Sequence, residues 1–138
     1  MNKEFDRGLI EDPYPLQEHL GFYMSDWSEG YARFELPLEA FLMNRYGIPH
    51  GGVYAMLLDT VMGYCGSFTG SSEHRQMAMT LTMNVSYLSR PKGKILIGEG
   101  TRTGGGAKTF FAEGKITDET GELIATSTGA FRKRSGSA

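Results

Sequence analysis

Residues Asn44–Gly66, "NRYGIPHGGVYAMLLDTVMGYCG", are the most informative segment of this chain. From about Gly51 to Phe68 the segment contains no proline, and Pro49 stands just before it, so the pattern predicts a helix. Apolar residues cover almost every side of that helix, which is typical of a buried one. One carboxylate, Asp59, interrupts them, although a carboxylate in an apolar setting is costly unless it is paired or functional.

Strand-like segments flank the predicted helix. "GFYMSDW" (21–27) and "YARFELPL" (31–38) precede it, separated by the turn residues 28–30. Four runs follow it, with short turns between them: 77–88, 94–104, 107–118 and 123–134. These four predict an antiparallel meander. The order of elements predicts an α+β domain in which a curved antiparallel sheet wraps around one long central helix.

Strict alternation in "MAMTLTMNVSYL" (77–88) gives that strand two different faces. Thr80, Thr82, Asn84 and Ser86 fall on a polar face. Met79, Leu81, Met83, Val85 and Tyr87 fall on the opposite, apolar face. The pattern therefore predicts that Thr80 lies on the polar side of its strand.

The chain has 138 residues, which predicts a single domain over residues 1–138. About 20 residues at the N-terminus form a helical or extended lead, in which "YPLQEHL" (14–20) predicts a short helix. The last six or so residues, at the end of "RKRSGSA" (132–138), are small or polar and predict disorder.

Composition and charge narrow the functional class. The net charge of -2 argues against a nucleic-acid partner. Neither a signal peptide nor an apolar run long enough to span a bilayer is present, so we expect a cytoplasmic protein with no membrane association. Cys65 is the single cysteine, which excludes an intrachain disulfide and fits a small buried residue. Most Lys and Arg residues lie from Arg90 onward, which fits either an anionic ligand or a solvated surface.

Small residues surround Asp59 on its face of the predicted helix, among them Gly52, Gly63 and Gly66. They allow either close packing of the helix on the sheet, with Asp59 bonded to backbone, or room for a substrate over the carboxylate. Arg45 is the only Lys or Arg between residues 44 and 66, so the segment offers almost no local partner for the charge. The pattern slightly favours a functional carboxylate.

The start of the helix offers a second functional group. Gly51 and Gly52 fall in its first turn, where backbone N–H groups lack intrahelical partners and can hold an oxyanion or a carbonyl oxygen, although the two glycines could simply begin the helix. Gly51 and Asp59 are eight residues apart, or about 12 Å along the axis. One carbonyl cannot contact both groups of one helix. If both serve one reaction, the site is shared between two chains of a homodimer.

The segment resembles the hotdog-fold acyl-CoA thioesterases, specifically the PaaI-like (phenylacetate-degradation) branch. The matching residues are Asn44, Gly47, His50, Gly51, Gly52 and Asp59, and the match continues through "MNVSYLSRP" (83–91) and "GELIATSTGAF" (121–131). The resemblance covers roughly residues 21–131. It implies the hotdog fold, hydrolysis of an acyl-CoA to a free acid and coenzyme A, and a homotetramer built as a dimer of dimers.

The resemblance also implies a role for each matching residue. Asp59 would act as general base on water or as nucleophile, and the Gly51 N–H would polarise the thioester carbonyl. Asn44 would orient the reacting group or the water, and His50 would support Asn44 or the loop. Thr80 would assist from the neighbouring strand, on the subunit that supplies Asp59.

Further expectations concern the substrate. Gly52 is expected to contact it, and Arg90, Lys92, Arg102 and Lys108 are candidates by charge for the phosphates of coenzyme A. Coenzyme A is part of the substrate, and neither a metal nor another cofactor is expected. The resemblance favours an aromatic or medium-chain acyl group. Tyr54, Met62, Tyr64 and Phe68 could line an aromatic pocket or pack in the core.

Two alternatives remain open. A hotdog enoyl-CoA hydratase or dehydratase pairs a histidine with an acid, but His50 and Asp59, nine residues apart, fall on roughly opposite faces of one helix. A non-catalytic acyl-CoA-binding protein would usually carry an extra regulatory segment, for which this chain leaves little room. Other hotdog thioesterases use a glutamate with a threonine one turn beyond it, where this sequence has Gly63.

Overall fold

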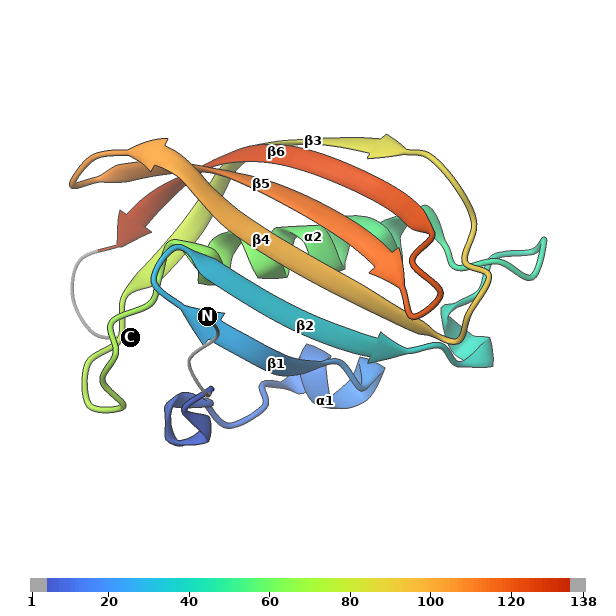
Figure 1. Cartoon of the computed structure of the whole chain (residues 1–138), viewed down its shortest axis with the longest axis horizontal. Helices are drawn as coiled ribbons and strands as arrows, with labels where there is room; N and C mark the ends of the chain where they lie inside the picture. The colour runs from blue at the N-terminus through green and yellow to red at the C-terminus, as the bar shows by residue number, and fades with distance from the viewer. Residues whose placement is uncertain (1–4, 135–138) are drawn as a thin grey trace.

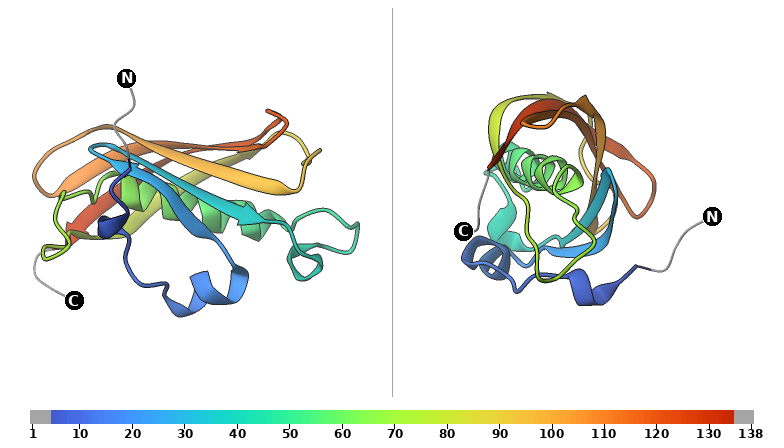
Figure 2. Two further views of the ribbon diagram at one scale, coloured as in Figure 1. Left: turned by 60° about the horizontal axis from the view of Figure 1, so that its bottom comes forward. Right: turned by 90° about the vertical axis from the view of Figure 1, so that its left-hand side faces the viewer.

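The computed structural model describes residues 5–134. One long helix, α2 (Gly51–Cys65), lies along the concave face of a six-stranded antiparallel sheet (Figures 1 and 2). The strands are β1 (Tyr23–Ser28), β2 (Tyr31–Pro37), β3 (Met77–Tyr87), β4 (Ile95–Gly105), β5 (Thr109–Asp118) and β6 (Leu123–Arg134). A short helix α1 (Pro15–Leu20) and two 3-10 turns, η1 (Arg7–Leu9) and η2 (Ala40–Leu42), complete the described chain. This confirms the α+β architecture of a curved sheet around one long helix.

The strand order is β1-β2-β4-β5-β6-β3, so the predicted four-strand meander is wrong at its first strand. Strands β4, β5 and β6 do form a meander, but β3 pairs with β6 instead of β4. Going from β3 to β4 therefore means crossing three strand spacings, about 14 Å. Residues 88–94 can span about 23 Å when extended, so this connection is long enough to cross the end of the sheet.

Helix α2 packs on β4 and β5 at a distance that only glycine permits. A Cβ atom on Gly100 would lie 2.2 Å from the carbonyl oxygen of Val61, and one on Gly114 would lie 3.0 Å from the Leu58 side chain. Gly100 and Gly114 face each other in register across the two strands. The helix is buried only on the side that faces the sheet, whereas the side that carries Asp59 is half-buried.

Strand β3 contains a register shift that alternation does not predict. Thr80 pairs with Phe131 of β6, but the next pair is Thr82 with Ala130, so Leu81 is an extra residue in the ladder. Phe131 is buried against the helix, and Thr80 lies on the same side as Phe131. The single polar face predicted for β3 is therefore wrong, because Thr80 faces α2 and Thr82 lies on the outer face.

The ends of the elements differ slightly from prediction. Helix α2 ends at Cys65 rather than near Phe68, and the N–H of the C-cap residue Gly66 bonds back to Tyr64. Strand β6 extends to Arg134, as the strand predicted over 123–134 does, and residues 135–138, which hold most of the predicted disordered end, lie outside the described residues. Within residues 5–134, no helix has the length and apolar character that crossing a bilayer requires.

Candidate active site

Asp59 projects from the middle of α2 into a cavity of about 450 Å³. The Thr80 hydroxyl, on β3 of the same chain, donates a hydrogen bond to Asp59 Oδ1 at 2.5 Å. Asp59 Oδ2 accepts no hydrogen bond from a described residue. The strand therefore holds one oxygen of the carboxylate and leaves the other directed at the space beside the helix.

A single stripe of α2 and the residues after it forms one wall of this cavity. Asp59 and Gly63 lie about one turn apart on it, and Ser67 follows four residues later, just past the end of the helix at Cys65. Aromatic side chains surround this stripe: Tyr14, Trp27, Tyr64 and Phe131. The cavity therefore extends along the helix, and its wall combines these aromatic rings with polar side chains.

The end of the cavity away from Asp59 carries a polar group of three residues. The Tyr64 hydroxyl donates to Glu11 Oε1 at 3.2 Å, and Arg75 Nε lies 3.6 Å from Glu11 Oε2. Burial and the nearby charge of Glu11 raise the pKa of Tyr64. Burial also raises the pKa of Tyr14, and the charge of Asp59 raises it further. Both phenols thus stay protonated and can donate hydrogen bonds.

Cys65 takes no part in this cavity. Its thiol is buried and donates to the Met62 carbonyl at 3.0 Å, and burial raises the pKa of the Cys65 thiol to about 12. This matches its interpretation as a small core residue. Among residues 5–134, no three His, Cys, Asp or Glu side chains lie close enough together to bind a metal ion.

The start of α2 presents a single unpaired donor in its first two residues. His50 is the N-cap, and its Nδ1 accepts a hydrogen bond from the Gly52 N–H at 2.8 Å. The His50 carbonyl accepts from the Val53 N–H at 2.9 Å. The Gly51 N–H has no partner among the described residues. Gly52 was expected to contact substrate, but its N–H is already bonded to His50, which leaves Gly51 as the donor.

Asn44 shapes the loop that leads into α2. Its Oδ1 accepts from the N–H groups of Tyr46 at 2.8 Å and Ile48 at 3.4 Å, and Gly47 adopts a φ of 76° within this turn. No hydrogen bond joins Asn44 to His50 in the described chain. The His50 side chain therefore caps the helix rather than supporting Asn44.

The four basic candidates do not meet in one chain. Arg90 and Lys92 precede β4, whereas Arg102 and Lys108 lie near its far end, about 33 Å away along the strand. Lys92 Nζ is 3.2 Å from Glu122, and the Arg102 guanidinium lies 5.9 Å from the centre of the Phe110 ring. A single phosphate-binding cluster from all four is excluded within one subunit.

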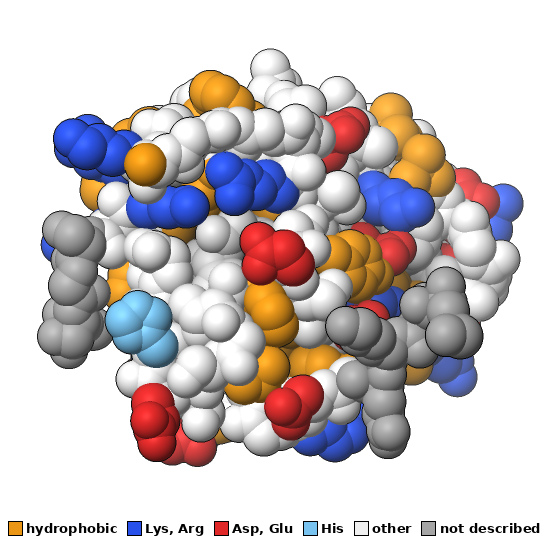
Figure 3. All heavy atoms as spheres, turned by 60° about the vertical axis from the view of Figure 1, so that its left-hand side comes forward, with side chains coloured by type: hydrophobic (Ala, Val, Ile, Leu, Met, Phe, Trp, Pro, Cys, Tyr) orange, Lys and Arg blue, Asp and Glu red, His pale blue; other side chains and the backbone are white. Residues whose placement is uncertain are grey.

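Other basic residues gather around Lys108. A second cavity at this end of the sheet is lined by Lys108 together with Arg132, Lys133 and Arg134 of β6. Figure 3 views this end of the molecule and shows Lys and Arg side chains in a band across its upper part. None of the three β6 residues was among the sequence candidates, because their strand was predicted without knowing that it ends beside Lys108.

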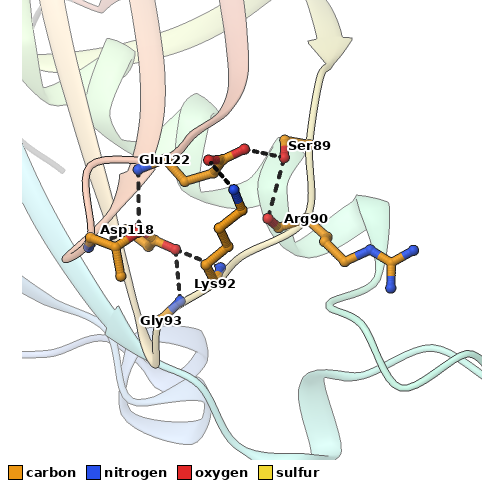
Figure 4. A network of polar contacts seen from close by, with 7 residues as sticks. Ser89, Arg90, Lys92, Gly93, Asp118 and Glu122 are labelled. Atoms are coloured by element: carbon orange, nitrogen blue, oxygen red, sulfur yellow. Dashed lines mark hydrogen bonds and ion pairs between the residues drawn. The ribbon is translucent and has the colours of Figure 1, made fainter.

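A network of polar contacts fixes the connection between β3 and β4 (Figure 4). The buried carboxylate of Asp118 accepts from the backbone N–H groups of Lys92 and Gly93 at 2.7 and 2.8 Å. Glu122 accepts from the Ser89 hydroxyl and pairs with Lys92. Figure 4 shows the Arg90 side chain pointing away from this network.

Asp118→Asn is expected to lower the free energy of unfolding by about 2–4 kcal/mol at pH 7, because an amide cannot accept from donors on both sides. Burial alone would raise the pKa of Asp118, but hydrogen bonds from Thr120 and from backbone N–H groups lower it below its ordinary value. The carboxylate therefore stabilises the fold above about pH 4, and this contribution is lost as the pH falls toward the lowered pKa. In urea titrations, the free energy of unfolding of wild type should exceed that of Asp118→Asn by less at pH 3 than at pH 7. An equal difference at both pH values would contradict a lowered pKa for Asp118.

Sequence reasoning missed most of the cavity wall. Glu11, Tyr14 and Arg75 come from the lead and from a loop, where no periodic pattern marks them. Of the four residues proposed for an aromatic pocket, Tyr64 alone lines this cavity. The other three lie elsewhere: Met62 and Tyr54 are buried in the core, and Phe68 packs edge-on against Trp27.

The sequence of this chain is similar to those of known proteins. The sequence pattern of the thioesterase superfamily matches residues 46–125, more than half of the chain. A protein of Halobacterium salinarum that bears the name "Putative esterase" is 31% identical over 88 residues. The aligned part covers 62% of this chain and 58% of that protein. The chain therefore spans little more than half the length of this curated relative.

Solved structures share the arrangement of a curved sheet around one helix. A conserved protein of Pseudomonas aeruginosa has a TM-score of 0.79 at 23% identity, over 92% of this chain and 97% of that one. The PaaI protein from the phenylacetic acid degradation operon of E. coli has a TM-score of 0.77 at 18% identity, over 88% and 86%. A thioesterase of Haemophilus influenzae has a TM-score of 0.76 at 22% identity, over 86% and 82%. At these identities the likeness concerns the fold.

Proposed function

Because the chain belongs to the thioesterase superfamily, we propose that it is an acyl-CoA thioesterase, with Asp59 as the catalytic carboxylate. The observation that carries this proposal is the Asp59 carboxylate, which Thr80 holds in the wall of a partly aromatic cavity large enough for an acyl group. One carboxylate oxygen remains open toward that cavity. This is the position that a general base needs beside a bound substrate.

In the proposed reaction Asp59 takes a proton from a water molecule as the water oxygen attacks the thioester carbonyl. The carbonyl oxygen becomes an oxyanion, and the Gly51 N–H of a second subunit donates a hydrogen bond to it. When the tetrahedral intermediate collapses, the C–S bond breaks and the coenzyme A thiolate leaves, taking up the proton. Direct attack by the carboxylate, which would form an acyl anhydride that water then hydrolyses, is the alternative route.

The shared site follows from the length of α2. Gly51 and Asp59 belong to one continuous helix and are about 12 Å apart along it, so they cannot contact the same carbonyl. Strand β3 is at one edge of the sheet, where the outward side chains of Met79 and Leu81 are 46% and 53% exposed. An exposed apolar edge strand favours pairing with a second copy. We therefore propose a homodimer with two shared sites, and a dimer of dimers above it.

The basic residues at the two ends of the sheet are the proposed partners of the coenzyme A phosphates, which form the anionic part of the substrate. Figure 4 shows Arg90 pointing away from the Asp118 network. Arg90 follows Tyr87 by three residues, and the Tyr87 hydroxyl donates to the Gly51 carbonyl at 3.4 Å, so Arg90 lies toward the end of the molecule that carries Gly51. Lys108 lies among three further basic residues at the opposite end. In an antiparallel dimer these two ends are brought together, and the phosphates of coenzyme A would contact them there.

The buried thiol of Cys65 fits a reducing cytoplasm.

The purified protein is expected to release coenzyme A from aromatic or medium-chain acyl-CoA thioesters. A thiol-reactive dye follows release across a panel of aromatic, short-chain and long-chain acyl-CoAs. The same panel includes an enoyl-CoA, whose hydration is followed by loss of its ultraviolet absorbance. Hydration without thiol release would favour the hydratase alternative, and binding of acyl-CoA with neither reaction would favour a non-catalytic acyl-CoA-binding protein.

A further inference from the structure

Gly63 lies one turn beyond Asp59, on the stripe of α2 that lines the cavity. Its backbone is helical, and it has no positive φ. A Cβ atom added there would meet only Phe131 within 4 Å, at an ordinary contact distance of 3.9 Å. Neither the backbone nor the packing requires glycine here, although glycine is a poorer helix residue than alanine. What the glycine does is leave space.

The contrast with Gly66, one residue past the end of the same helix, makes this clear. A Cβ atom on Gly66 would lie 2.2 Å from the Phe110 ring, so packing explains that glycine. No comparable contact explains Gly63. The space over Gly63 belongs to the cavity into which Asp59 projects.

The walls around this space are rigid and aromatic. The Trp27 ring packs edge-on against Tyr64 at 5.5 Å between centroids, and the Trp27 indole N–H donates to the Tyr64 carbonyl at 2.9 Å. The Tyr64 hydroxyl is held by Glu11. Rings that are fixed in this way form one continuous aromatic wall, against which a flat group can stack or pack edge-on.

We propose that Gly63 is the specificity-determining residue of the acyl pocket. Its bare backbone admits the ring of an aryl-bearing acyl group, and the thioester carbonyl then lies beside Asp59. The inference rests on the proposed function, because it takes the acyl part of a thioester as the occupant. A side chain at position 63 would occupy the volume of the ring and leave room only for a short acyl group.

The test compares Gly63→Leu with wild type on phenylacetyl-CoA and acetyl-CoA. Gly63→Leu is expected to lower kcat/KM for phenylacetyl-CoA by about 100-fold and to keep kcat/KM for acetyl-CoA within about threefold. Gly63→Ala should have a smaller effect of the same kind, with an equal or higher Tm. Gly106→Leu is the matched control, since Gly106 also has open space around it and lies in the β4–β5 turn, outside the cavity. It should leave both substrates unaffected.

A binding measurement separates this inference from the proposed function. Trp27 is the only tryptophan in the chain and lines the cavity, so its fluorescence reports occupation of the pocket by phenylacetate. Binding to wild type that is lost in Gly63→Leu supports the pocket, even if no acyl-CoA is hydrolysed and the proposed function fails. Equal binding by both proteins, no binding to wild type, or an unchanged substrate preference in a folded Gly63→Leu variant would overturn the inference.

Discussion

An Asp59→Asn variant is expected to hydrolyse acyl-CoA with a kcat about 10²–10⁴-fold below wild type. Asparagine has nearly the same shape and can still accept the hydrogen bond from Thr80, but it cannot take a proton from water. Because Asp59 is only half-buried, the free energy of unfolding should change by no more than about 1 kcal/mol. Steady-state kinetics and thermal denaturation of the same preparation measure the two effects.

Glu113→Gln provides the control for loss of a carboxylate, because Glu113 is exposed on β5, outside the cavity. It should keep the wild-type kcat. Full activity in Asp59→Asn would remove Asp59 from the mechanism. Single-turnover hydrolysis in ¹⁸O-labelled water tests the nucleophilic role. Label in the Asp59 carboxylate would mark a covalent anhydride that water opens at the Asp59 carbonyl carbon, whereas a general base leaves the Asp59 carboxylate unlabelled.

Gly51→Pro is expected to lower kcat by about 10²–10³-fold, because proline has no N–H to donate to the oxyanion. The first position of a helix tolerates proline, and His50 has the extended backbone, φ -60° and ψ 140°, that a residue before proline adopts. Gly51→Ala keeps the N–H and adds the same Cβ, which would lie 3.3 Å from the Tyr87 ring. A large loss in proline with a small loss in alanine would assign the effect to the N–H, whereas equal losses would assign it to crowding against Tyr87.

Mixing the two inactive chains tests whether the site is shared. Each mixed dimer of Asp59→Asn and Gly51→Pro chains holds one intact site, made from the normal Asp59 of one chain and the normal Gly51 of the other. Random pairing after co-expression should therefore restore about a quarter of wild-type activity. No recovery in a preparation shown by mass spectrometry to contain mixed dimers would contradict the shared site.

The parts of this fold that could be predicted from the sequence are those that local patterns determine. The absence of proline after Pro49 gave the start of α2, and alternation with turn residues gave six strands close to their observed bounds. The pairing of β3 with β6 could not be predicted in this way, because it depends on which strand lies beside which in space. The bulge at Leu81 was also missed, since the residue letters alternate regularly through it.

In the candidate site, too, some features follow from local sequence patterns and others depend on the three-dimensional arrangement. Asp59 stands out in the sequence because a carboxylate with almost no basic neighbour is unusual in an apolar helix. Gly51 stands out because two consecutive glycines are unusual at the start of such a helix. The distance between the two residues is fixed by helical rise. The hydrogen bond between the Thr80 hydroxyl and Asp59 depends on the register of β3, because a strand shifted by one residue would turn Thr80 away. The bond from Gly52 to His50, which removes one of two equivalent donors, depends on a side-chain rotamer that no sequence pattern determines.

Two residues of the cavity wall, Glu11 and Tyr14, come from a different part of the chain than Asp59 does. The stretch that matches the family begins at residue 46, so the proposed catalytic carboxylate and the helix that carries it lie inside the matching region, and these two wall residues lie well before it. In the proposed thioesterase, exchanging the lead for that of a relative would therefore alter one part of the acyl pocket, while Asp59 and the pocket residue Gly63 stay on α2. Recombination of a short N-terminal segment would then adjust the range of acyl groups separately from its control by Gly63.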